Sequence, residues 1–229
     1  MGYCINIDEV SGEEILPGVI KKVLLEPKHI GRGPPGDLTV THYTLTEGGV
    51  ITFEDPKVEN QDYIINGTAL FGRKHVHANT TIFVPSFKKH SYKHAGESKV
   101  QLLSHTYTVP HPNHRWCKTR MAQLTFPLDS EQLMTEEFHG LVGAHRFHAL
   151  DVQTYDVPEH TNPEETAYFM RGTGKMRSGD KWYDVRPGSL VYVEEEATHE
   201  IRCNHPTQYF VMEYVEQDKM WRERGYQES

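Results

Sequence analysis

The stretch YDVPEHTNPEETAYFMRGTG, residues 155–174, decides how the rest of the chain is interpreted. Residues that favour β-strands surround His160 and Glu165, and a glycine pair closes the stretch. Successive side chains of a strand point to opposite faces, so Glu165 shares one face with Ala167 and Phe169. The stretch therefore predicts a strand that turns one carboxylate toward an apolar interior and ends in a glycine hairpin.

Composition restricts the class of protein. The 229 residues suit one large β domain or two domains of about 100 residues. The formal net charge of −8, without a long Lys/Arg run, disfavours a nucleic-acid or membrane partner. No signal peptide and no apolar run near 18 residues is found, and the three cysteines are too widely spaced for a disulfide framework. We therefore expect a soluble cytoplasmic protein.

Short runs rich in β-branched and aromatic residues recur along the chain, such as DLTVTHYTL in the first half and SLVYVEEE in the second. Many short strands at regular spacing predict an all-β sandwich or barrel, and two strand-rich halves suggest an internal repeat. The expected organisation is an irregular segment 1–36, an N-terminal barrel 37–109, a linker 110–140, a C-terminal barrel 141–215, and a tail or helix 216–229.

Two spaced patterns occur in the C-terminal half. Four residues separate His160 from Glu165, six separate Glu165 from Gly172, and ten separate Gly188 from His199. These spacings match parts of G-x5-H-x-H-x3,4-E-x6-G and G-x5-P-x-G-x2-H-x3-N, the motifs of the cupin superfamily, which the chain resembles. The Pro, Gly and Asn of the second motif are replaced by Glu194, Glu196 and Cys203.

The same spacing recurs in the N-terminal half, where Gly67 closes the first motif and Pro85 and His90 occupy their places in the second. The ligand positions of the first motif hold Phe53, Asp55 and Asn60, and two glycine positions of the second hold Asn79 and Phe87. The resemblance therefore implies a bicupin, an all-β chain with two double-stranded β-helix (cupin) barrels in tandem. It also implies that the N-terminal site is degenerate.

In cupins the motif ligands usually bind one metal ion inside the barrel, which implies that His160, Glu165 and His199 hold an ion here. Two histidines and one carboxylate suit Fe(II), Mn(II), Zn(II) or Ni(II), and three protein ligands leave open positions for water, O2 or substrate.

The position of the first family histidine holds Pro158, which cannot ligate. Either three protein ligands suffice, or a neighbouring residue completes the set. Glu159 has the wrong strand parity relative to His160 unless a bulge intervenes. Asn162 fits if one residue is deleted before the glutamate. These alternatives stay open at the level of sequence.

The resemblance implies a metal-dependent enzyme that acts on a small polar molecule. A dioxygenase is slightly favoured over a lyase, an isomerase or a ureidoglycine aminohydrolase-like hydrolase, and the alternative is a non-catalytic small-molecule or sugar-binding bicupin. Cupins commonly associate, so a homodimer is expected. The candidate catalytic residues are Glu165 and Glu194, and the candidate substrate-binding residues are Phe169, Arg171 and Cys203.

Overall fold

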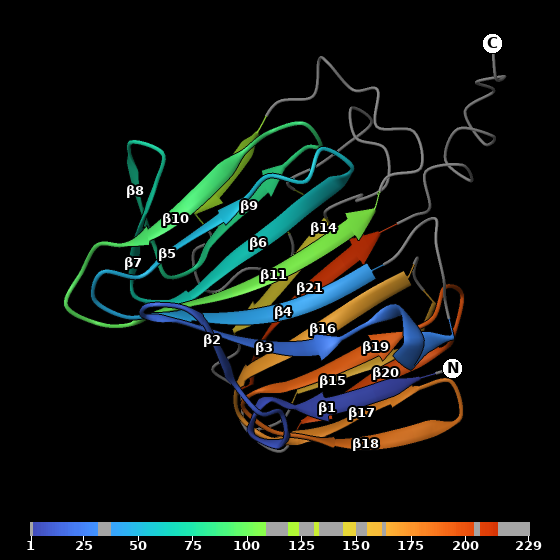
Figure 1. The fold of residues 1–229 in the computed structure, drawn as a ribbon. Helices are drawn as coiled ribbons and strands as arrows, with labels where there is room; N and C mark the ends of the chain where they lie inside the picture. The colour runs from blue at the N-terminus through green and yellow to red at the C-terminus, as the bar shows by residue number, and fades with distance from the viewer. Residues whose placement is uncertain are drawn as a thin grey trace, which may run out of the picture. The chain divides into compact units, whose positions relative to one another are not determined.

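The computed structural model describes residues 2–31, 38–108, 119–123, 131–132, 144–149, 155–161, 164–203 and 207–214 (Figure 1). These residues form β-strands and turns, with two short 3-10 segments and no α-helix. Among them, no helix is long and apolar enough to cross a membrane. The all-β fold class expected from the strand pattern is confirmed.

The chain divides into two compact units. Of the described residues, the N-terminal unit comprises those between 10 and 123, and the C-terminal unit comprises those between 2 and 9 and between 131 and 214. In the described residues, each unit contains one large sheet and one four-stranded sheet, and all strand pairs are antiparallel.

The N-terminal unit has a seven-stranded sheet in the order β12-β9-β6-β11-β4-β3-β2 and a four-stranded sheet in the order β5-β10-β7-β8. The large sheet contains β2 (Glu13–Leu16), β3 (Val19–Leu25), β4 (Leu38–Leu45), β6 (Val58–Asn66), β9 (Thr80–Val84), β11 (Val100–Thr108) and β12 (Arg120–Gln123). The small sheet contains β5 (Val50–Phe53), β7 (Thr68–Phe71), β8 (Lys74–His77) and β10 (His90–His94).

The C-terminal unit has a six-stranded sheet in the order β1-β19-β16-β21-β14-β13 and a four-stranded sheet in the order β15-β20-β17-β18. The large sheet contains β1 (Tyr3–Asn6), β13 (Glu131–Gln132), β14 (Ala144–Ala149), β16 (Glu164–Arg171), β19 (Ser189–Val193) and β21 (Gln208–Tyr214). The small sheet contains β15 (Tyr155–His160), β17 (Gly174–Ser178), β18 (Lys181–Val185) and β20 (His199–Cys203).

The strand order of one unit repeats in the other. The core of each large sheet is β9-β6-β11-β4 in the N-terminal unit and β19-β16-β21-β14 in the C-terminal unit. The small sheets, β5-β10-β7-β8 and β15-β20-β17-β18, correspond strand for strand. The internal repeat that the sequence spacing predicts is therefore present in the topology of the described strands.

Left-handed backbone conformations mark the same repeat. Gly67 and Gly172, which close the first motif in each half, have φ angles of 82° and 83°. Asn79 and Gly188 stand at the first glycine of the second motif, with φ angles of 67° and 87°. The second glycine position is filled by a larger residue in each unit, with the same left-handed backbone: Phe87 (φ 64°) and Glu196 (φ 59°).

An apolar core joins the two sheets of each unit. In the N-terminal unit it includes Ile64 and Leu102 from the large sheet and Ala69 from the small sheet. In the C-terminal unit it includes Ala167, Phe169 and Val191 from the large sheet, together with Met176, Ile201 and Cys203 from the small sheet. The inner face of each sheet is therefore the one that alternation in the strands predicts.

The expectation of an irregular segment at residues 1–36 is wrong, because β1, β2 and β3 lie within it. Strand β1 pairs with β19 in the C-terminal unit, with Cys4 opposite Val191. The side chain of Asn6 donates hydrogen bonds to Pro187 O and Ser189 Oγ, both at 3.1 Å. Most of the expected linker 110–140 and the tail 216–229 lie outside the described residues.

Candidate functional site

Strands β15 and β20 bring two histidines together in the C-terminal unit. The antiparallel register pairs His160 with His199, at the point where a bulge after Val157 shifts the pairing. The two imidazole rings have centroids 4.1 Å apart and are inclined at 54°. The histidines that the motif spacing selects, 39 positions apart in the chain, are therefore in contact.

Strand β16 adds the carboxylate. Glu165 lies on the face of β16 that carries the core residues Ala167 and Phe169, as strand parity predicts. Its Oε1 lies 3.0 Å from Nε2 of His199, and the two side chains are only 3% and 2% exposed. The structure thus brings His160, Glu165 and His199, here called the His–Glu–His cluster, to one place inside the C-terminal unit.

Backbone carbonyls orient both imidazole rings. Nδ1 of His160 lies 2.8 Å from Pro158 O, and Nδ1 of His199 lies 3.1 Å from Ala197 O. A carbonyl oxygen only accepts hydrogen bonds, so in each ring Nδ1 carries the proton and donates it. The lone pair of a neutral ring is then on Nε2, which is the usual arrangement around a metal-ligating histidine.

The distance between Glu165 and His199 fits two different arrangements. At 3.0 Å, a protonated Nε2 would donate a hydrogen bond to the carboxylate. The same distance suits two ligands of one ion, because ligand atoms about 2.1 Å from a metal and at right angles to each other are about 3.0 Å apart. In the described part of the chain, however, no three His, Cys, Asp or Glu side chains are arranged as a ready metal site.

The neighbours of His160 answer one question left open by the sequence. Glu159 is exposed and forms an ion pair with Arg177, which also pairs with Glu200 at 3.1 Å. Its carboxylate is therefore engaged by Arg177 at the surface, even though the bulge after Val157 removes the parity argument against Glu159. Pro158 is exposed, and Asn162 lies outside the described residues.

Comparison with solved structures identifies the fold. A protein from Leptotrichia buccalis described as a cupin 2 conserved barrel domain protein superposes with a TM-score of 0.59 and 13% identity, over 92% of this chain and 94% of the other. The chain has a cupin fold. Protein Ylba from E. coli, assigned to DUF861, gives a TM-score of 0.73 at 16% identity, over 93% and 90% of the two chains. A deletion mutant of oxalate decarboxylase from Bacillus subtilis gives 0.63 at 12% identity, over 93% and 77%.

Sequence comparisons add one domain-level match. The family of AraC-like ligand binding domains matches residues 142–227, which include the His–Glu–His cluster. Comparison with curated proteins found no similar sequence. At these identities the solved structures establish the cupin fold alone, and the cluster itself has to carry any functional argument.

The other predicted site residues of the chain are not part of the His–Glu–His cluster. Glu194 is exposed in the turn after β19, where its carbonyl accepts a hydrogen bond from Ala197 N at 3.0 Å. Phe169 and Cys203 are buried in the core, each four residues along a strand from a cluster residue. At about 3.3 Å per residue, this places them roughly 13 Å from the cluster. Arg171 is exposed, two residues further along β16.

The N-terminal unit contains a buried polar group that sequence analysis missed. Asp62 is completely buried, and its Oδ2 accepts a hydrogen bond of 2.7 Å from the Tyr92 hydroxyl. Nε2 of His90, the histidine of the second cupin motif, lies 3.5 Å from the same oxygen. Asp62 stands two residues after Asn60, which holds the motif glutamate position, so a search by motif spacing passes over it.

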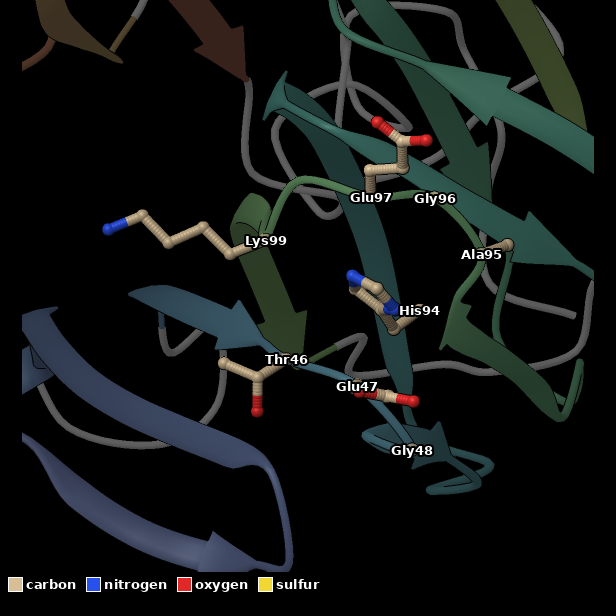
Figure 2. Close-up of a pocket in the computed structure, with 8 residues that line it drawn as sticks. All are labelled: Thr46, Glu47, Gly48, His94, Ala95, Gly96, Glu97 and Lys99. Carbon is tan, nitrogen blue, oxygen red and sulfur yellow. The ribbon is translucent and has the colours of Figure 1, made fainter.

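A cavity of about 710 Å³ opens at the other end of β10 in the N-terminal unit. Figure 2 shows His94 between the turn that carries Glu47 and the turn that carries Glu97 and Lys99. Nε2 of His94 donates a hydrogen bond to Ser98 O at 3.0 Å. No residue of the His–Glu–His cluster lines this cavity, so it is a separate surface feature.

Proposed function

We propose that the chain is a metal-dependent enzyme whose C-terminal unit binds one divalent ion through His160, Glu165 and His199. The observation that carries the proposal is the buried contact of 3.0 Å between Glu165 Oε1 and His199 Nε2, with the His160 ring beside it. The backbone bonds at Nδ1 of both histidines support it, because they leave the Nε2 atoms to face an ion.

The candidate ions are Fe(II), Mn(II), Zn(II) and Ni(II), all of which accept imidazole and carboxylate ligands. When bound, such an ion polarises a coordinated oxygen atom of substrate or water, or provides a place for O2. Glu165 and the two histidines hold and orient the ion, and the core around Ala167 and Val193 excludes water from one side. Glu194, which is exposed, has no part in this proposal.

We propose a small polar molecule with a metal-binding oxygen as substrate, and O2-dependent cleavage as the first reaction to test. Support for a dioxygenase comes from the ligand set alone, because two histidines and one carboxylate suit non-haem iron. The second reaction class is a lyase that needs no net oxidation. The likeness to oxalate decarboxylase favours it, although at 12% identity that likeness concerns only the fold.

One further function has a specific observation in its favour. The match of residues 142–227 to AraC-like ligand binding domains supports a non-catalytic module that binds a small molecule or sugar. In that case the contact between Glu165 and His199 is a simple hydrogen bond and no ion is needed. We also propose that each unit is one cupin barrel and that two chains associate as a homodimer.

Elemental analysis of untagged protein separates the two functions. We expect about one equivalent of Fe, Mn, Zn or Ni in the wild-type chain and its loss in His199→Ala. A matched control is His94→Ala, which removes a histidine of the N-terminal unit and should leave the metal content unchanged. If the wild type contains no metal and takes up none from Fe(II), Mn(II), Zn(II) or Ni(II), the enzyme proposal is wrong. If the wild type does bind a metal, oxygen uptake by the metal-loaded protein distinguishes a dioxygenase from a lyase.

A further inference from the structure

The interior of the N-terminal unit holds two buried polar atoms, His90 Nε2 and Asp62 Oδ1, that have no hydrogen-bond partner among the described residues. Nδ1 of His90 lies 3.1 Å from Lys88 O, so Nδ1 donates to that carbonyl and Nε2 of the neutral ring is an acceptor. This Nε2 is 3.5 Å from the Asp62 carboxylate.

The carboxylate is also short of positive charge. Asp62 is completely buried, and its Oδ2 accepts a hydrogen bond from the neutral hydroxyl of Tyr92. Burial and the charge of Asp62 raise the pKa of Tyr92 well above its usual value, so this hydroxyl stays protonated and donates. In the described part of the chain, His90 is the only basic side chain paired with the carboxylate. A buried carboxylate without a full ionic partner is costly, and a bound cation would remove that cost.

Aromatic rings surround these acceptors. Phe53 stacks on His90 with ring centroids 4.9 Å apart and planes inclined by 11°. Phe71 packs on Tyr92 at 5.1 Å, and Tyr43 meets Phe53 edge-on at 5.7 Å. Phe53 and Phe71 are only partly buried, so these two rings lie on the side of this aromatic group that reaches solvent. Such rings attract cations through their π faces.

The two units differ in the residue that lies opposite the motif histidine. Strand register sets Phe53 opposite His90, where His160 stands opposite His199. A ring without a ligand atom thus occupies the position of one proposed metal ligand. With His90 and Asp62 alone, the N-terminal unit has two ligand side chains, fewer than the three of a typical catalytic metal site.

We infer that the N-terminal unit binds a primary ammonium group, with Asp62 and His90 accepting its N–H bonds and Phe53 and Phe71 contacting its alkyl part. An ammonium supplies the positive charge that the carboxylate lacks and the donors that both acceptors lack. The site uses no residue of the His–Glu–His cluster, so it does not depend on the proposed metal.

Calorimetry on the full-length chain with n-butylammonium chloride tests the inference, in buffer with a chelator to remove metal ions. We expect saturable binding of one equivalent. The neutral analogue 1-butanol lacks the charge, and tetramethylammonium lacks N–H donors, so both should bind at least about tenfold more weakly. Equal binding of tetramethylammonium would contradict the role of Asp62 and His90 as acceptors.

Variants locate the binding. Asp62→Asn should weaken n-butylammonium about 30-fold or more, because a buried charge loses its partner. Glu54→Gln is the matched control, since it removes an exposed carboxylate of the same unit that pairs with Lys89, and should leave binding unchanged. Phe53→Leu keeps the site apolar and should weaken binding about threefold by removing one π face. It also serves as a second test if Asp62→Asn fails to fold.

Three results would overturn the inference. The first is the absence of saturable n-butylammonium binding to folded wild-type protein, and the second is equal binding by wild type and Asp62→Asn. The third is stoichiometric Zn²⁺ binding by the Glu165→Gln variant that is lost in the double variant Glu165→Gln/Asp62→Asn, because Asp62 and His90 would then form a metal site.

Discussion

Two buried histidines of the N-terminal unit should make the protein sensitive to mild acid. His42 on β4 and His105 on β11 are 2% and 0% exposed. Burial is the main cause that lowers the pKa of each from 6.5 to about 4. For His42 the charges of Lys22 and Lys99 lower the pKa further, whereas for His105 a hydrogen bond donated to the Gln61 backbone and the charge of Asp62 oppose the lowering.

The sign of the effect follows from where protons bind. In the unfolded chain both histidines take up a proton as the pH falls through 6.5, but the folded chain resists this until about pH 4. Stability is therefore intact above about pH 6.5 and is lost as the pH falls toward 4. A pKa difference of about 2.5 corresponds to about 3 kcal/mol per histidine below pH 4, and about 2 kcal/mol per histidine at pH 5. The two together amount to about 4 kcal/mol at pH 5, a large part of a typical stability of 5–15 kcal/mol.

Urea unfolding at pH 7.5 and pH 5.0 measures this loss. We expect the wild-type N-terminal unit to lose about 4 kcal/mol more between these pH values than the double variant His42→Leu/His105→Leu. His75→Gln is the control, because His75 is exposed on β8 and should not change the difference. If the wild type and the double variant lose equal free energy, the buried histidines are not the acid-sensitive groups and the reasoning is refuted.

Three further predictions concern single positions. Phe87 is 57% exposed and has a left-handed backbone with a φ of 64°. Phe87→Gly should therefore stabilise the N-terminal unit by about 1 kcal/mol, measured by thermal unfolding. An equal gain in stability in Phe87→Ala would contradict backbone strain as the cause. Asn6→Ala removes three hydrogen bonds and should cost the C-terminal unit about 1–3 kcal/mol, seen as faster hydrogen exchange in β19 but not in β9. Glu165→Gln should weaken Mn²⁺ binding at least about tenfold in a metal titration, whereas Glu159→Gln should not; equal effects would argue against Glu165 as a ligand.

The features that could be predicted from the sequence are those that depend on local spacing. Strand parity places Glu165 on the same face as Ala167 and Phe169, because the period of a strand is two regardless of its neighbours. The matched glycines Gly67 and Gly172 predict the repeat, because both turns require a left-handed backbone at the same place. Short-range rules of this kind hold whatever the rest of the chain does.

The features that sequence analysis missed depend on contacts between distant segments. Strand β1 was expected to be irregular because its four residues, YCIN, show little pattern, and its partner β19 lies more than 180 positions away. Asp62 was missed because its neighbours Gln61 and Asn60 make the segment look like a polar surface strand, although all three side chains are buried. Burial on both faces of a strand removes the alternation on which the prediction depends.

The two units show how one backbone can carry two kinds of site. The first residue of β10 and of β20 is a histidine, and in each unit a carbonyl two residues earlier accepts a hydrogen bond from its Nδ1. That common geometry turns Nε2 of His90 and His199 toward a buried carboxylate. What differs is the residue opposite the histidine, a phenyl ring in one unit and a second imidazole in the other. Because an imidazole offers a ligand atom and a phenyl ring offers only a π face, this facing position is where the proposed metal chemistry and the proposed ammonium binding diverge.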